Sequence, residues 1–367
     1  YGTTNIQNLH YGLIHVGLPT MVDIDKDNLP NIIDGNVPKN YELCKEGDIA
    51  FADASEDTNE VAKAVEFYNL NGKKVVCGLH TIHGRDNKNK TVVGYKGYAF
   101  SSMSFHHQIR RIAQGTKIYS INSKNFSECY VGIPSKDEQQ KIADLLRLID
   151  ERIATQNKII EDLKKLKSAI IDYAINSLNT DFAKFGSLYE MAGEGGTPTT
   201  SNASFYDNGK IPFIKIDDLK QKYLTENKDF ITELGLQKSS AWLVPTHSIL
   251  FSNGATIGEI SITTYPVCTK QGILGIVPKQ NIDVEYLYYF MSSSYFKKAV
   301  SRIVTEGTMK TAYLKDINNT LCPIPTKKEQ QEIAKIPSAL NSKIDFEQSI
   351  LKLFCSQKQY LLRQMFI

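Results

Sequence analysis

Apolar residues between Ile133 and Leu178 recur at steps of three and four, the spacing that places them on one face of a helix. Neither proline nor glycine interrupts the stretch after Pro134. Ser135, followed three residues later by Glu138, forms a capping box at its start. The pattern predicts one helix over Ser135–Leu178, roughly 60–65 Å long at ~1.5 Å per residue. Its predicted coiled-coil seam is Ile142, Leu146, Ile149, Ile153, Ile160, Leu163 and Ile170.

The same pattern occurs again at Ile324–Ile367, where Pro325 and Glu329-Gln330-Gln331 repeat Pro134 and Glu138-Gln139-Gln140. A period near 190 residues is too long for a solenoid and indicates two copies of one large unit. Each copy is a globular module followed by a long helix. The simplest burial of the two apolar stripes packs the helices antiparallel. The second seam is predicted at Leu340, Ile344, Leu351, Phe354 and Leu361.

Three polar or helix-breaking residues interrupt these stripes. Gln156 and Glu347 stand at equivalent positions. Two interpretations stay open for them: a gap that tolerates solvent, which we favour slightly, and a buried polar device that fixes the helix register. Pro337 stands where the first copy has Leu146, and a proline there is expected to kink or restart the second helix.

Strand patterns and turn residues fill the two modules, which predicts an α+β fold: two β-rich modules separated by two long antiparallel helices, with an internal pseudo-twofold repeat. The first module is shorter by about 20 residues at its start, so we expect its opening strand to be absent and residues before Tyr1 to be missing. The predicted domains are 1–132, 133–180, 181–323 and 324–367. The predicted strands are Tyr11–Val16, Gly47–Phe51, Lys73–Cys77, Ile211–Ile216 (equivalent to Tyr11–Val16) and His247–Phe251, with helices at Phe105–Ile112 and Val284–Tyr295.

Bulk properties narrow the class of protein. The chain has 367 residues with 43 Lys and Arg against 40 Asp and Glu, a formal net charge of +3, which neither announces nor excludes a nucleic-acid partner. Its 6 cysteines contain no CxxC pair, which favours reduced thiols and a cytoplasmic location. No apolar run is long enough to span a membrane.

Catalytic signals are weak. The histidines His80, His83, His106 and His107 have no cysteine or carboxylate at ligand spacing in the sequence, so no metal site is predicted. Ser252 lacks the surroundings of a nucleophile elbow, and no glycine-rich loop fits a nucleotide or S-adenosylmethionine. We therefore expect no catalytic residue, no metal and no cofactor in this chain.

The layout of module, helix, module, helix, with IPSKDEQQKIADLL and IPTKKEQQEIAKIP opening the helices, resembles the specificity subunits of type I restriction-modification systems. The segments GKIPFIKIDDL, GATIGEI and EGTMKTAYL resemble that family as well. The resemblance covers the whole chain and implies that the modules are target recognition domains. It also implies that the chain itself is not an enzyme and that its partners are a bipartite double-stranded DNA site, methyltransferase subunits in two copies, and restriction or translocase subunits, with no membrane.

Reading a split site requires phosphate contacts and base-edge contacts from each module. A second class stays open, a coiled-coil scaffold that holds two protein-binding modules apart without touching DNA. The near-neutral charge favours that scaffold mildly, and the family resemblance disfavours it. The candidate DNA-binding residues are Arg85, Lys88, Lys90, Arg110 and Arg111 in the first module, and Lys215, Lys220, Gln221, Lys222, Asn253, Thr256 and Lys270 in the second.

Overall fold

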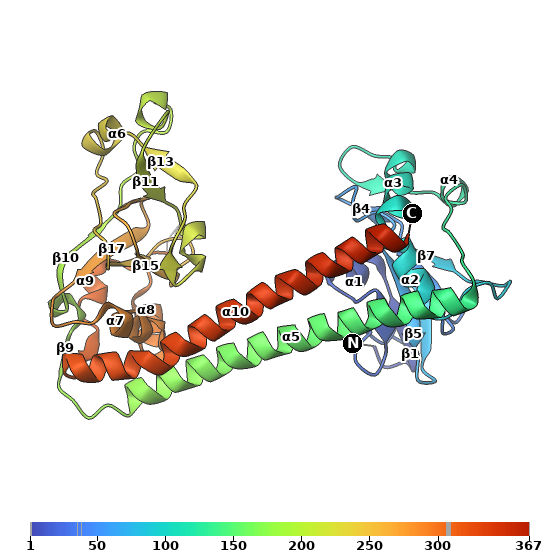
Figure 1. Cartoon of the computed structure of the whole chain (residues 1–367), viewed down its shortest axis with the longest axis horizontal. Coiled ribbons are helices and arrows are strands. Elements are labelled where there is room, and N and C mark those ends of the chain that lie inside the picture. Colours follow the sequence, from blue (N-terminus) through green and yellow to red (C-terminus); the bar gives the residue numbers. More distant parts are fainter. Residues whose placement is uncertain (1, 35, 38, 306–309, 367) are drawn as a thin grey trace. The chain divides into compact units, whose positions relative to one another are not determined.

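The structure is a computed structural model that describes residues 2–34, 36–37, 39–305 and 310–366. It divides into two compact units, which we name unit 1 (Tyr1–Lys158 with Gln348–Ile367) and unit 2 (Ile159–Glu347) (Figure 1). The division cuts both long helices near their middles. Each unit therefore holds one β-rich module, the beginning of one long helix and the end of the other, and the predicted α+β class is confirmed. Residues 306–309 of the EGTMKTAYL segment, and Ile367, lie outside the described residues.

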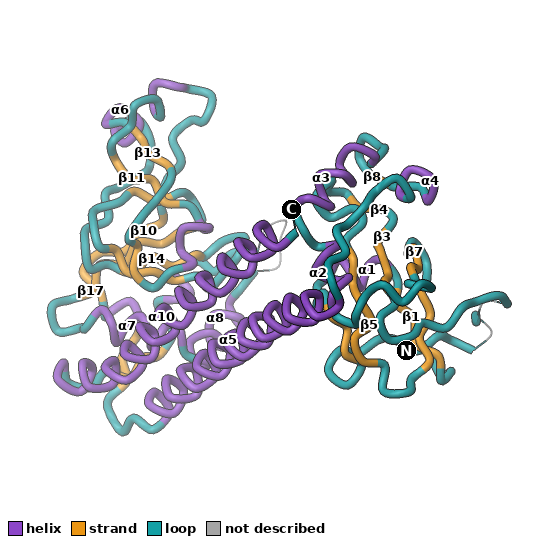
Figure 2. Tube along the Cα trace, turned by 45° about the vertical axis from the view of Figure 1, so that its right-hand side comes forward, coloured by secondary structure: helices purple, strands orange, loops and turns teal. Residues whose placement is uncertain are grey.

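Unit 1 is built on a four-stranded sheet of order β2-β5-β3-β7, with two small two-stranded sheets, β1-β6 and β4-β8 (Figure 2). Its elements are β1 (Ile6–Leu9), α1 (Tyr11–Val16), β2 (Met21–Asp23), β3 (Ile49–Ala52), β4 (Ala54–Ser55), β5 (Ala64–Asn69), β6 (Lys74–Cys77), β7 (Thr81–Gly84), α2 (Tyr95–Phe100), α3 (Met103–Ile112), β8 (Tyr119–Ser120), α4 (Ser123–Phe126) and the first part of α5 (Lys136–Asn176).

Unit 2 is built on a five-stranded sheet of order β10-β17-β14-β15-β12, a three-stranded sheet β13-β11-β16 and the pair β18-β9. Its elements are β9 (Phe182–Lys184), η1 (Phe185–Ser187), β10 (Tyr189–Glu194), η2 (Ala203–Phe205), β11 (Ile211–Ile214), η3 (Ile216–Lys220), β12 (Tyr223–Leu224), β13 (Asp229–Ile231), α6 (Glu233–Gln237), β14 (Ile249–Ser252), β15 (Ile260–Thr263), β16 (Cys268–Thr269), β17 (Ile273–Pro278), α7 (Val284–Ser292), α8 (Ser294–Ile303), α9 (Leu314–Ile317), β18 (Leu321–Pro323) and the first part of α10 (Lys327–Met365).

The two units repeat one sheet in the same order and register. The order β2-β5-β3-β7 matches β12-β15-β14-β17, with the outer pair parallel in both. Ile49 faces Glu66 and Gly84 in unit 1, as Ile249 faces Ile262 and Ile276 in unit 2. Strand β10 extends the sheet of unit 2 beyond β17, and no strand in the described part of unit 1 pairs with the corresponding edge of β7.

The predicted strand Tyr11–Val16 is wrong, because this segment is helix α1. Gly17, with φ +123°, ends the helix, and its N–H donates to the carbonyl of Leu13, which is a glycine C-cap. The strand lies earlier, at β1, which runs parallel to β6 as β11 runs parallel to β16. Ile211–Ile214 therefore corresponds to Ile6–Leu9, and the short helix α1 corresponds to η3. The predicted helix Val284–Tyr295 is in fact two helices, because the Ser293 hydroxyl accepts from the Phe296 N–H and starts α8.

A buried glutamine anchors the beginning of each long helix to its module. Gln139 Oε1 accepts from the Val92 N–H (3.0 Å), while its Nε2 donates to the carbonyls of Lys90 and Pro134. Gln330 repeats all three bonds with the Asp283 N–H and the carbonyls of Asn281 and Pro325. Both side chains are almost completely excluded from solvent. Because only backbone groups are bonded, this anchor constrains the helix and leaves the partner side chains free to differ.

The ends of the long helices pack antiparallel to the beginnings within each unit. In unit 1 Lys358 Nζ lies 2.5 Å from Asp150 Oδ1, and in unit 2 Lys167 Nζ donates to Asn341 Oδ1 at 2.9 Å. These two pairs are equivalent under the repeat, so the antiparallel register is the same in both units. All the predicted seam residues are buried or half-buried, and Ile142, Leu146 and Leu361 also pack on the module of unit 1. No helix in the described ranges combines the length and apolarity needed to cross a bilayer.

Two predictions about the stripes need correction. Helix α10 runs without a break through Pro337, which is buried, so the helix does not restart there. The proline lacks one N–H and therefore one helix hydrogen bond, yet the residues on both sides of it are helical. The alternative, a kink at Pro337, stays a prediction. Gln156 and Glu347 are each only 7% exposed, which rules out the favoured interpretation of a solvent-tolerant gap. The interpretation as a register device stays a prediction.

Candidate nucleic-acid interface

Three loops converge at one end of the repeated sheet in each unit, and we call this region the three-loop end. In unit 2 the Asn253 N–H donates to the carbonyl of Gly272, and the Ala312 N–H donates to the carbonyl of Asn253. In unit 1 Asp53 makes the same two bonds with His80 and Ile121. The loops are 53–63 (which includes β4), 78–80 and 113–122 (which includes β8) in unit 1. In unit 2 they are 253–259, 270–272 and the described part of 304–313.

Four of the predicted DNA-binding residues lie at or beside these loops. Arg110 and Arg111 occupy the last turn of α3, and Arg110 Nη1 donates to Asn59 Oδ1 in the first loop. Thr256 and Lys270 are exposed on the corresponding loops of unit 2. The sequence reasoning missed Arg302, which is exposed in the last turn of α8 and is equivalent to Arg111. The shared serine caps of the two helices, Ser102 and Ser293, were a signal that could have revealed it.

Lys88 and Lys90 are exposed but lie elsewhere. They follow β7, whereas loop 78–80 precedes it, so they stand at the opposite end of that strand. Their segment is a turn held by hydrogen bonds. The Asp86 carboxylate accepts from the backbone and hydroxyl of Thr91 and from the Lys88 N–H. Burial alone would raise its pKa, but these hydrogen bonds lower the pKa of Asp86 to about 2.

Arg85 is committed to carboxylates and is a poor candidate for binding phosphate. Its Nε donates to both oxygens of Asp48, its Nη2 to Asp48 Oδ2 (2.6 Å), and its Nη1 pairs with Glu42. Burial would raise the pKa of Asp48, yet hydrogen bonds from Arg85, the Lys45 backbone and His83 lower it overall. The arginine therefore supports the fold of unit 1.

Lys215, Lys220 and Gln221 line a polar hollow around η3. The same hollow is lined by four carboxylates, from Asp217, Asp218, Glu226 and Asp229. Lys215 Nζ pairs with Asp229 (2.8 Å) and Lys220 Nζ with Asp217 (2.9 Å). The lysine charges are thus largely neutralised where they stand, which makes this hollow less suited to a phosphate backbone.

Lys222 and Asn253 are buried, which makes them poor candidates for contact with DNA. Lys222 is 7% exposed and pairs with Glu285, and its Nζ also donates to Tyr289 Oη (2.8 Å). Desolvation lowers the pKa of Lys222, and the Glu285 carboxylate opposes that shift. Asn253 is 1% exposed and holds the three-loop end together through its backbone. Composition near a strand end does not distinguish such inward-facing residues from surface ones.

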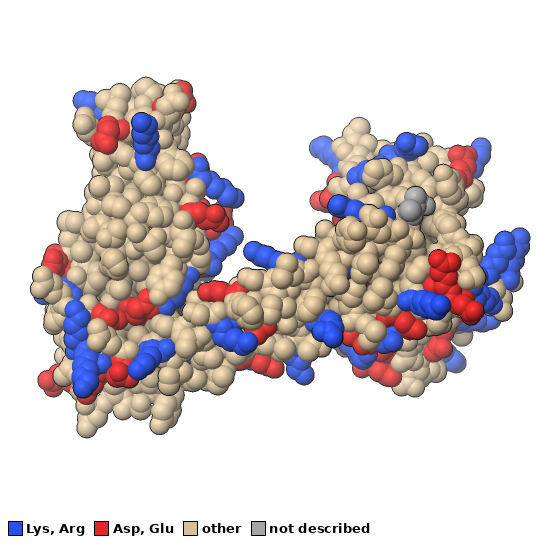
Figure 3. All heavy atoms as spheres, viewed as in Figure 1, with Lys and Arg blue, Asp and Glu red and all other residues tan. Residues whose placement is uncertain are grey.

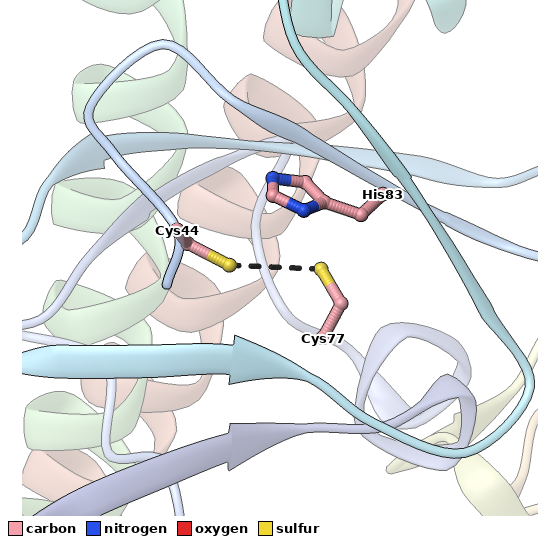
Figure 4. Close-up of side chains that lie close together, drawn as sticks. All are labelled: Cys44, Cys77 and His83. Atoms are coloured by element: carbon pink, nitrogen blue, oxygen red, sulfur yellow. Dashed lines mark hydrogen bonds between the residues drawn. The ribbon is translucent and has the colours of Figure 1, made fainter. Parts of the chain in front are cut away.

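The structure also brings together residues that the sequence separates. Cys44, Cys77 and His83 each place one potential ligand atom within 4.8 Å of the others (Figure 4). His83 has no cysteine at ligand spacing in the sequence, but the fold places two cysteines beside it. Spacing along the chain could not show it, because Cys44 precedes β3 and meets the end of β6 only through sheet pairing.

Charges of both signs are interspersed over the face of the molecule shown in Figure 3, with no continuous field of one sign. This agrees with the formal net charge of +3. A nucleic-acid interface on such a surface would depend on a few placed arginines and lysines and on polar loops, because the bulk charge supplies little attraction.

The repeated module and paired long helices define a protein class, and comparison with known families identifies it. The chain belongs to the family of the type I restriction modification DNA specificity domain, whose profile matches residues 27–165 and again residues 179–353. Each matched range covers most of one module and part of the long helix that follows it. The double match agrees with the repeat seen in the sheets.

Individual relatives carry the same description. The chain is 26% identical over 227 residues to the EcoR124I/EcoR124II specificity subunit of Escherichia coli, which covers 58% of this chain and 55% of that protein. It is 32% identical over 171 residues to the MjaIX specificity subunit of Methanocaldococcus jannaschii, covering 45% and 38%. The match thus spans about half the length of the first relative and less of the second.

Solved structures share the fold. A chain from a study of complex assembly and conformational transition in the type I R-M system superposes with a TM-score of 0.63 at 15% identity, covering 97% of this chain and 90% of that chain. The S subunit of a type I restriction-modification system from M. genitalium superposes with a TM-score of 0.54 at 17% identity, covering 99% and 88%.

Proposed function

We propose that this chain is the DNA-recognition subunit of a type I restriction-modification complex, and that each module reads one half of a bipartite double-stranded site. The observation that carries the proposal is the repeat of the whole unit, with the same sheet register, the same three-loop end and the same buried glutamine anchor. Two equivalent readers on one chain suit a site with two separated halves, in the way that paired modules set half-site spacing elsewhere.

In this proposal the chain performs no chemical step. Methyltransferase subunits, two by the symmetry of the repeat, and restriction subunits dock on it, and the paired helices hold the readers apart. The three-loop ends face the DNA. The end in unit 1 contributes Arg110 and Arg111, and the end in unit 2 contributes Arg302, Thr256 and Lys270. Guanidinium and ammonium groups would bind phosphates, and Thr256 and backbone groups of the loops would reach base edges.

Exchange of one module tests the function. Replacing residues 181–323 with the second module of a relative should change one half-site and leave the other half and the gap unchanged. The exchange is structurally reasonable, because Gln330 binds only backbone atoms of the module. Mapping methylated positions in cells that carry the chain and its methyltransferase measures the outcome. A change in both halves would contradict independent readers, and sites unaffected by the exchange would favour the scaffold without DNA contact.

The arginines at the helix ends provide a test of the interface. Arg111→Ala and Arg302→Ala should each weaken DNA binding by the assembled complex to a similar degree for all sequences. Each lost phosphate contact should reduce the slope of log affinity against log salt by about 0.9. Lys88→Ala is the matched control, because Lys88 is an exposed cation at the opposite end of β7, and it should leave the slope unchanged. Equal effects of all three variants would place the DNA elsewhere.

A further inference from the structure

We propose that unit 1 contains a binding site for a thiophilic divalent cation, zinc by its ligand chemistry, formed by Cys44, Cys77 and His83. Two thiolates and an imidazole are the ligand set that selects Zn²⁺ over harder cations. Binding forms two metal–sulfur bonds and one metal–nitrogen bond, and both thiol protons pass to solvent. Cys77 and His83 are half-buried, so a water molecule completes the tetrahedral set of four.

The separation of the sulfur atoms fits a shared metal. Cys44 Sγ and Cys77 Sγ lie 3.7 Å apart, and both thiols are free. Two sulfurs on one tetrahedral Zn²⁺, each at ~2.3 Å, are separated by roughly 3.8 Å. Sheet pairing sets the distance between the two sulfur atoms. Leu43 forms an antiparallel β-bridge with Val76, and the Cys44 N–H donates to the carbonyl of Val75. The two ligands are thus preplaced by backbone hydrogen bonds.

The histidine is oriented as metal-bound histidines are. His83 Nε2 lies 2.9 Å from Asp48 Oδ2. The Asp48 carboxylate is paired with Arg85 and is ionised, so it can only accept a hydrogen bond from His83. Nε2 therefore carries the proton, and the lone pair resides on Nδ1, the ring nitrogen on the side of the sulfurs (Figure 4). Asp48 is 3% exposed and is fixed in turn by Arg85 and the Lys45 N–H. This carboxylate–histidine arrangement is the usual outer support of a metal ligand.

The second unit lacks all three ligands at the equivalent positions. Val244 corresponds to Cys44, because its N–H donates to the carbonyl of Val267 as the Cys44 N–H donates to the carbonyl of Val75. Thr269 in β16 corresponds to Cys77, and Gly275, which faces Leu250 as His83 faces Ala50, corresponds to His83. The shared fold therefore does not require this cluster. In unit 1 a metal would join the β1-β6 sheet to the four-stranded sheet.

Metal binding by the full chain tests the site. The reduced, chelator-treated protein should take up one Zn²⁺ per chain, measured by elemental analysis after desalting, and Co²⁺ should give the sulfur-to-metal charge-transfer absorption of a thiolate site. Zn²⁺ in excess should raise the midpoint of thermal unfolding by on the order of 5–10 °C. Asp48→Asn should weaken the affinity about 10–100-fold, because it removes the support of His83.

The matched variants each have one cysteine fewer. Cys44→Val installs the residue of unit 2 and should abolish the uptake, the Co²⁺ band and the thermal shift, whereas Cys355→Ser, which changes an exposed cysteine elsewhere, should retain all three. Equal uptake by Cys44→Val and the unaltered chain would overturn the proposal. A Cys44–Cys77 disulfide in freshly purified protein, with no zinc uptake after reduction, would overturn it as well.

Discussion

Inserting four residues after Lys158 in α5 and four after Ser349 in α10 should lengthen the gap between the two half-sites by one to two base pairs. Four helical residues add ~6 Å at ~1.5 Å per residue, and a base pair of DNA occupies ~3.4 Å. The first position lies at the division between the units and the second lies two residues beyond it, and the two are equivalent under the repeat. Both helices need the insertion, because each is anchored in unit 1 and in unit 2. Four residues also nearly preserve the apolar phase, since the helix repeats every ~3.6 residues.

The structure changes where the insertion belongs. From the sequence, the natural place is after Asn176, at the exit of the first helix. However, Ile171 and Ile175 are buried in the core of unit 2, and Asp172 Oδ1 accepts from the Ser294 N–H at 2.7 Å. Residues added after Asn176 would extend only the connection to β9, so this variant is the control and should keep the gap. Mapping methylated sites distinguishes the two, and an unchanged gap in the double insertion would refute the helices as the spacer.

Replacing Glu285 by alanine should destabilise unit 2 by about 3–5 kcal/mol, the usual cost of leaving one member of a buried ion pair unpaired. The Lys222 side chain is 3% exposed, and its remaining partners, Tyr289 and the Ser338 hydroxyl, carry no charge. For a unit of this size the thermal midpoint should fall by roughly 6–20 °C. Lys222→Met combined with Glu285→Leu should recover most of the loss, because an apolar pair needs no desolvated charge.

The pH dependence of this variant has a definite sign. Desolvation lowers the pKa of Lys222 in the folded state below its ordinary value of 10.5. Removing Glu285 takes away the carboxylate that opposes this shift, so the folded-state pKa of Lys222 lies lower still in the variant. Between the folded-state pKa values of the variant and the unaltered chain, the folded variant binds fewer protons than the folded unaltered chain, so the stability of the variant rises more steeply with pH. The stability that Glu285→Ala loses relative to the unaltered chain should therefore shrink as the pH rises from 7 toward 10. Calorimetry of the unfolding of unit 2 at several pH values measures this loss. A loss of stability that does not change with pH would show that lost packing, and not the buried charge of Lys222, destabilises the variant.

The parts of the fold that depend on local periodicity could be predicted from the sequence. The long helices, their caps and the repeat follow from residues close together in the chain, and the Ser135 hydroxyl does accept from the Glu138 N–H. The strand prediction for Tyr11–Val16 failed, because a short apolar run fits a strand or a helix equally well. Which of the two forms depends on the pairing of β1 with the distant strand β6. Local patterns contain no information about such pairing.

The candidate site was predicted less well for a related reason. Exposure of Lys88, Arg111 or Thr256 follows from loop and helix-end composition, but the burial of Lys222 depends on Tyr289 and Glu285, more than sixty positions away. The cluster of Cys44, Cys77 and His83 is likewise assembled by sheet pairing. Arg302 could have been found by aligning the helices of the two modules through their serine caps.

The discontinuous composition of unit 1 has a consequence for synthesis on the ribosome. Its core includes Phe366, which packs with Tyr95, Tyr98 and Leu146 at the very end of the described chain. Translation at about 5–20 residues per second puts roughly 10–40 s between the completion of residues 1–158 and the arrival of the segment from Gln348. During that interval the first module exposes the apolar face that α10 later covers. Unit 2, made of one continuous stretch, can fold first, so the second module is expected to mature before the first.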